Sequence, residues 1–169
     1  MPHEPQGRSR SQVPKQSAGI LPFKVSSDQN VEVLIVHPGG PFWKNKESHA
    51  WSVAKGEYDV DELPEGAAER EFTEELGLPV PEGKRFDLGE VQQTGGKRVR
   101  VWAVEVEDVP LGDFLSNRFE IEWPPGSGRR QSFPEIDKAE WVPLTEARGR
   151  LVKAQGEFLD RLLAVRFSN

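Results

Sequence analysis

The 169-residue sequence contains no cysteine. This absence excludes disulfides, thiolate metal sites and cysteine nucleophiles together. Histidine is scarce as well: His3, His37 and His49 are the only three, and they are too scattered for a histidine-ligated zinc site. No apolar run approaches membrane-spanning length, and the N-terminus lacks the hydrophobic segment of a signal peptide. We therefore expect a cytoplasmic protein without a membrane partner.

An excess of basic charge is also missing. Lys and Arg together number 22 against 28 Asp and Glu, which gives a formal net charge of −6. The chain as a whole lacks the basic footprint of a nucleic-acid-binding protein, so we expect no stable nucleic-acid partner. If it handles a smaller polyanion, it needs local basic groups or bound cations to do so.

The order of apolar patterns predicts one α/β domain. Residues 1–16 are polar, with three Pro and no apolar periodicity, and we expect a disordered leader. Strand-like runs occupy 17–25, 31–38, 50–56, 87–94, 97–107 and 139–144, and a helical tail follows to residue 167. Pro22 indicates that the first strand lies partly at a sheet edge or carries a bulge. Residues 108–134 are rich in Pro and Gly and are expected to be irregular. We predict an α/β sandwich around a mixed sheet, formed by residues 17–169.

The most unusual segment is GEYDVDELPEGAAEREFTEELGL, residues 56–78, which holds seven Glu and two Asp against a single Arg. Pro64 and Gly77 are placed to begin and end a helix. On that helix Glu71, Glu74 and Glu75 have the spacing i, i+3, i+4, which puts them on one face. Like charges at this spacing cost roughly 0.2–0.5 kcal/mol per pair. Two explanations remain open at this point: a solvated acidic face, or a set of oxygen ligands for a hard cation such as Mg²⁺.

The spacing within the segment is more specific than its charge. It fits G-x5-E-x7-R-E-U-x-E-E-x-G-U, where U is a bulky apolar residue, without a gap or a substitution. Seven positions are fixed in identity, so a chance match is on the order of 10⁻⁹ per starting point. In this pattern the sequence resembles the Nudix hydrolase family.

The resemblance implies a Nudix-type α/β/α sandwich and a pyrophosphohydrolase that uses Mg²⁺ or Mn²⁺ to cleave a nucleoside diphosphate linked to another moiety. By position, the resemblance implies that Glu71, Glu74 and Glu75 are metal ligands and that Glu75 also orients or deprotonates water. It implies that Arg70 holds these glutamates in place. Structural roles are implied for Gly56, Glu62 and Gly77. Many family members carry a further carboxylate before the last strand. Glu135 is our candidate for this ligand or general base, with Glu140 as the alternative.

Candidate substrate-binding residues lie outside the motif. Lys55 precedes the motif glycine, Arg98 and Arg100 alternate along one strand, and Trp43 could stack on a base. SAGILPF and W-x-x-x-KGE are similar to the diadenosine polyphosphate hydrolase branch, although Ala54 stands where that branch usually has Pro. We expect a small nucleotide substrate, a dinucleoside polyphosphate or nucleoside triphosphate, and a monomer or homodimer. The alternatives are a nucleotide-sugar hydrolase, a diphosphoinositol polyphosphate hydrolase and a non-catalytic nucleotide-sensing module.

Overall fold

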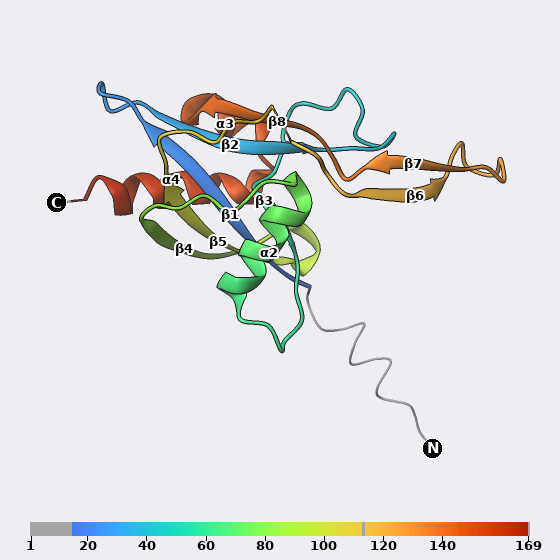
Figure 1. Cartoon of the computed structure of the whole chain (residues 1–169), viewed down its shortest axis with the longest axis horizontal. Helices are drawn as coiled ribbons and strands as arrows, with labels where there is room; N and C mark the ends of the chain where they lie inside the picture. Colours follow the sequence, from blue (N-terminus) through green and yellow to red (C-terminus); the bar gives the residue numbers. More distant parts are fainter. Residues whose placement is uncertain (1–14, 113, 169) are drawn as a thin grey trace, which may run out of the picture.

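The computed structural model describes residues 15–112 and 114–168 (Figure 1). Most of the expected leader, residues 1–14, lies outside the described residues, and the first strand already begins at Gln16. The elements follow in the order β1 (Gln16–Val25), β2 (Val31–Pro38), β3 (Ala54–Glu57), α2 (Pro64–Leu76), β4 (Arg85–Gln92), β5 (Arg98–Glu105), β6 (Arg118–Glu122), β7 (Arg130–Pro134), β8 (Ile136–Pro143), α3 (Leu144–Arg150) and α4 (Gly156–Arg166).

The main sheet is mixed, as predicted. Its strand order is β4-β5-β1-β2-β8, with β3 paired to β1. The β1–β5 pair is parallel, whereas β1–β2, β1–β3, β2–β8 and β4–β5 are antiparallel. Strands β1 and β2 form one antiparallel hairpin, and β4 and β5 form another.

Strand β1 lies inside the sheet, but its pairing on one side is interrupted at Pro22, the residue that predicts a partial edge or a bulge. On one side β1 pairs with β5 from Gln16 to Phe23. On the other side it pairs with β3 up to Ile20 and with β2 from Phe23 onward. Pro22 therefore lies where β1 changes partner, and the N–H that proline lacks is not required by either ladder on that side.

Each face of the sheet is covered by helix, which confirms the α/β/α sandwich (Figure 1). Side chains alternate across the pleat of β5: Val99, Val101 and Ala103 join one core with residues of α3 and α4, whereas Trp102 and Val104 join the other with residues of α2. Helix α2 thus packs flat on the sheet through one apolar side, and its opposite side is left for polar residues.

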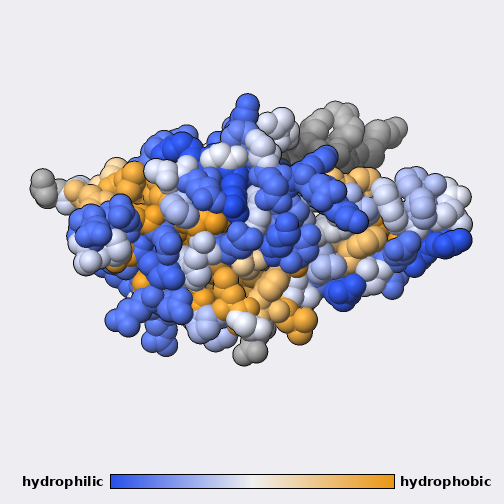
Figure 2. All heavy atoms as spheres, turned by 90° about the horizontal axis from the view of Figure 1, so that it is seen from above, coloured by the Kyte–Doolittle hydropathy of each residue, from blue (hydrophilic) through white to orange (hydrophobic). Residues whose placement is uncertain are grey.

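The segment 108–134 contains a two-stranded sheet, so the expectation that it is irregular is wrong. Strands β6 and β7 pair antiparallel from Arg118↔Pro134 to Glu122↔Arg130 and project from the body as an arm (Figure 1). Its outer end is mostly hydrophilic (Figure 2). Near it, Phe42 of the 39–50 loop meets Trp123 edge to face, with ring centroids 5.3 Å apart. The arm and the loop therefore support each other beside the sheet.

No helix within the described residues is both long enough and apolar enough to span a membrane.

Candidate active site

Helix α2 presents the acidic residues of the motif beside the side that it buries against the sheet. Ala67, Ala68, Phe72 and Leu76 are buried against the sheet. Pro64 occupies the first turn of the helix, and Gly77 ends it in the left-handed conformation with φ of 66°, donating its N–H to the Thr73 carbonyl at 2.7 Å. A Cβ at Gly77 would also lie 2.5 Å from the carbonyl oxygen of Leu115. The expected structural role of this glycine therefore has two physical causes.

Gly56 lets strand β3 approach the Glu71 carboxylate. A Cβ built at Gly56 would lie 1.8 Å from Glu71 Oε1, which is far inside van der Waals contact. The side chain of Glu71 occupies the volume that any other residue at position 56 would fill. The first glycine of the motif thus sets the position of one glutamate 15 residues later.

Arg70 binds three glutamates of the motif at once. Its Nε and Nη2 donate to the two carboxylate oxygens of Glu62 at 3.0 and 2.9 Å, a bidentate pair. Its Nη1 donates to Glu71 at 2.8 Å and to Glu74 at 3.3 Å. Arg70 therefore couples the loop before α2 to the acidic face of the helix.

Carboxylates from three elements line one cavity of about 410 Å³. Glu71, Glu74 and Glu75 come from α2, Glu57 comes from the end of β3, and Glu135 comes from the junction between β7 and β8. The backbone of Glu135 is held from both sides, because its N–H donates to the Asn117 carbonyl at 2.7 Å and its carbonyl accepts from Gly39 N–H at 2.9 Å. Lys55 and Lys97 line the same cavity.

The charges in this cavity are not balanced by the protein. Burial, the negative charge of Glu135, a hydrogen bond with Glu135 and the negative charge of Glu71 together raise the pKa of Glu75 to about 8, against the opposing charge of Lys55. Burial also raises the pKa of Glu71, against the opposing hydrogen bond from Arg70. The pKa of Lys55 is lowered by burial and by the charge of Lys97. Glu71, Glu75 and Lys55 are therefore partly desolvated ionisable groups in one cavity, as active sites commonly have.

The donor chemistry of the cavity suits a hard divalent cation. Such ions prefer carboxylate oxygens, and the raised pKa values of Glu71 and Glu75 indicate negative charge that a cation would compensate. Across residues 15–112 and 114–168, no three His, Cys, Asp or Glu side chains are already grouped closely enough to enclose an ion. Glu71 and Glu74 instead both bind Arg70. Glu71, Glu74, Glu75 and Glu135 thus fit a cation by type and by shared cavity, while a closed cage is not formed among the described residues.

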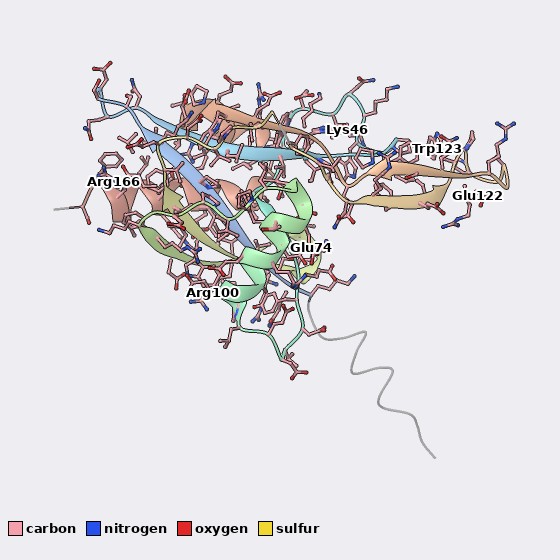
Figure 3. All side chains as sticks on the ribbon, viewed as in Figure 1. Lys46, Glu74, Arg100, Glu122, Trp123 and Arg166 are labelled. Atoms are coloured by element: carbon pink, nitrogen blue, oxygen red, sulfur yellow. The ribbon has the colours of Figure 1, made fainter. Side chains whose placement is uncertain are left out.

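Some candidate residues lie elsewhere. Arg100 donates to Asp87 at 2.6 Å, Arg98 lies 3.9 Å from Glu90, and neither lines the cavity. Figure 3 shows Arg100 well apart from Glu74, toward β4. Glu140, the alternative to Glu135, accepts a hydrogen bond from Arg150 at 3.0 Å and is also outside the cavity.

Sequence reasoning missed Lys97. Lys97 lies immediately before β5, next to Arg98, which the sequence predicts as a substrate-binding residue. The turn between β4 and β5 brings Lys97 to the cavity that the carboxylates line. The basic run KR at 97–98 was the available signal, but which of the two cations reaches the cavity depends on the turn. Trp43 lines a second cavity that adjoins the first, whereas the neighbouring Phe42 packs on Trp123.

The comparisons with known proteins agree with this fold. The sequence matches the NUDIX domain family over residues 14–162. Among solved structures, an Ap4A hydrolase of C. elegans in a binary complex superposes with a TM-score of 0.61 at 18% identity, covering 90% of this chain and 97% of that one. The NUDIX domain of Shewanella oneidensis NrtR complexed with ADP ribose superposes with a TM-score of 0.62 at 14% identity, covering 97% of this chain and 94% of that one. A MutT protein from Methanosarcina mazei Go1 superposes with a TM-score of 0.57 at 19% identity, covering 93% of this chain and 99% of that one. No curated protein matches the sequence.

Together, the sandwich and the acidic helix define a hydrolase of phosphoanhydride bonds. The chain belongs to the Nudix family.

Proposed function

We propose that this Nudix hydrolase is a divalent-metal-dependent pyrophosphohydrolase of a nucleoside polyphosphate, either a dinucleoside polyphosphate or a nucleoside triphosphate. The reaction is attack of water at a phosphorus, which breaks one P–O bond of the phosphoanhydride and gives two phosphate-containing products. The observation that carries the proposal is the shared cavity, which five carboxylates and two lysines line together.

The two lysines suit the phosphate chain. An anhydride of phosphates carries several negative charges, and Lys55 and Lys97 supply the local positive charge that the acidic chain otherwise lacks. Lys55 pairs with Gly19 of β1, and a Cβ at Gly19 would come within 2.8 Å of Lys55 Cβ. The base of the Lys55 side chain is therefore closely packed, and we assign the ammonium group to a phosphate of the substrate.

The carboxylates supply ligands and a base. Glu71, Glu74, Glu75 and Glu135 would hold Mg²⁺ or Mn²⁺, with Arg70 as a positioning residue that orients Glu71 and Glu74. When bound, such a cation screens the phosphoryl oxygens and acidifies water. Glu75 and Glu135 lie together at the boundary between the two cavities, where either can accept the proton of the attacking water.

The test is product release from a panel of nucleoside triphosphates, dinucleoside polyphosphates, nucleotide sugars and diphosphoinositol polyphosphates. It is run with Mg²⁺, with Mn²⁺, with EDTA, and with the Glu75→Gln variant. We expect turnover of a nucleoside polyphosphate that both EDTA and the substitution abolish. Mass analysis after reaction in ¹⁸O-water identifies which phosphorus the water attacks.

Two outcomes would replace the proposal. Turnover confined to nucleotide sugars or to diphosphoinositol polyphosphates would assign the chain to another substrate class. No turnover, together with stabilisation of the fold by a nucleotide, would favour a nucleotide-sensing module.

A further inference from the structure

A second cavity adjoins the one that holds the carboxylates. Its volume is about 380 Å³, within the range of pockets that take small ligands, and it shares Lys55, Glu75, Lys97 and Glu135 with the first cavity. Beyond these four, its wall is mainly apolar and carries the indole of Trp43. A molecule whose phosphates lie against the lysines would extend its other end into this space.

The polar groups on this wall form a hydrogen-bond chain whose direction is fixed by the backbone. The N–H of Val53 can only donate, and it donates to Gln155 Oε1 at 2.9 Å. The other atom of the Gln155 amide is therefore nitrogen. Gln155 is fully buried, so this amide has no competing water.

The same logic fixes the orientation of Gln93. Gln155 Nε2 donates to Ser52 Oγ at 3.0 Å and to Gln93 Oε1 at 2.9 Å, which uses both of its hydrogens. The oxygen of Gln93 is thereby directed at Gln155, and the Nε2 of Gln93 has no hydrogen-bond acceptor among the described residues. Because Gln93 lines the cavity, it offers the ligand a hydrogen-bond donor there.

A fixed donor discriminates among nucleobases. Guanine and uracil carry an oxo group where adenine and cytosine carry an amino group. An oxo group accepts from Gln93, whereas an amino group would place donor against donor and leave both unpaired. An indole on the same wall suits any base equally, since every base has a face for stacking.

We propose that this second cavity holds the base of the substrate and that Gln93 determines specificity by donating to an oxo group. The chain then prefers guanine and uracil nucleotides over adenine and cytosine nucleotides. This inference rests on the proposed function for the presence of a nucleotide.

The experiment compares kcat/KM for GTP with ATP, and for UTP with CTP, or for the dinucleotide equivalents if those are the substrates. We expect the oxo base of each pair to be favoured about 10- to 100-fold, the effect of one hydrogen bond made or left unpaired. Gln93→Glu keeps an oxygen for Gln155 Nε2 and presents an acceptor instead of a donor, so the preference should reverse. Gln93→Met should reduce it to within about threefold.

Gln92 provides a matched control. It is exposed, lies one position away and does not line the cavity, so Gln92→Glu introduces the same charge with no change in preference. Binding of GMP and AMP, followed by tryptophan fluorescence, reports on the cavity without turnover. Equal kcat/KM for all bases, or a preference that Gln93→Glu leaves intact, overturns the base-reading role but not the hydrolase. Preferential binding of GMP with no hydrolysis of any nucleotide would support the base site and overturn the proposed reaction.

Discussion

Replacing Gly56 with alanine should separate the activity of this protein from its stability. The added Cβ would lie 1.8 Å from Glu71 Oε1 and 2.0 Å from its carboxylate carbon, whereas real Cβ contacts stay beyond 3.0 Å. The backbone of Gly56 is not in the left-handed region, so alanine is compatible with it. The Glu71 carboxylate must therefore retreat by about 1.2 Å, the difference between the 1.8 Å approach and the 3.0 Å limit. A displacement of about 1 Å in a catalytic constellation costs about 100-fold in rate.

The stability change should be small, because opposing effects nearly cancel. Glu71 loses its hydrogen bond from Arg70, worth about 1.5–3 kcal/mol for a charged pair, but part of that is regained when the mobile carboxylate meets water. The unfolded chain loses backbone freedom, which stabilises by about 0.4–1 kcal/mol. We expect a decrease of no more than about 1.5 kcal/mol in the free energy of unfolding.

The assay is kcat/KM with Mg²⁺ beside urea unfolding in EDTA. Gly66→Ala is the matched control: Gly66 lies within α2 with nothing inside 4 Å of a built Cβ, so alanine should raise stability by about 0.5–1 kcal/mol and leave the rate unchanged. Full activity of Gly56→Ala would show that the position of Glu71 does not depend on this glycine. Unfolding of the variant would show that the substitution acts on the fold rather than on the site.

Three further predictions concern the same cavity. In EDTA, the raised pKa of Glu75 means that the folded protein binds more protons than the unfolded chain between pH 4.5 and about pH 8, so the free energy of unfolding should fall as pH rises through this range. Urea unfolding at several pH values should show a weaker dependence of this free energy on pH for Glu75→Gln. An identical dependence in the two proteins would contradict the assignment. Arg70→Lys keeps the positive charge but loses the planar guanidinium group, which binds Glu62 and also reaches Glu71 and Glu74. We therefore expect kcat to fall about tenfold or more with little change in KM. A variant with normal kcat would argue against a positioning role for Arg70. Lys97→Met should lower kcat/KM about 10- to 100-fold by removing a charged contact to phosphate. Arg98 does not line the cavity, so kcat/KM of Arg98→Met should stay within about twofold of the unsubstituted protein. Equal losses of kcat/KM in the two variants would refute the distinction between these neighbours.

Local physics is enough to predict the acidic helix. Its start at Pro64, its end at Gly77 and the common face of Glu71, Glu74 and Glu75 all follow from 3.6-residue periodicity and backbone conformation, which depend on neighbours in the chain. The alternation along β5 likewise predicts a strand whose side chains divide between two cores, and the structure has both. These features were readable because the interactions that cause them are short in sequence.

Local sequence patterns do not predict features that depend on a partner strand or loop far away in the sequence. Pro22 predicts a partial edge or a bulge, yet β1 lies inside the sheet because β3 and β2 pair with it on either side of the proline. The Pro- and Gly-rich segment 108–134 predicts irregular structure, yet it forms the β6–β7 arm, which packs against the 39–50 loop through Phe42 and Trp123. In both cases the partner strand or loop outweighs local propensity.

The sequence by itself determined the helix, its glutamates and the family, because the motif is contiguous and its spacing is set by one helix. Only the tertiary structure decided which other residues complete the site. Lys97 rather than Arg98 reaches the carboxylates because of the turn before β5, and Glu135 rather than Glu140 does so because its backbone is held between Gly39 and Asn117. Gln93 acquires its fixed orientation from Gln155, 62 residues away, through a hydrogen bond that exists only once the sheet and the C-terminal helices have packed together.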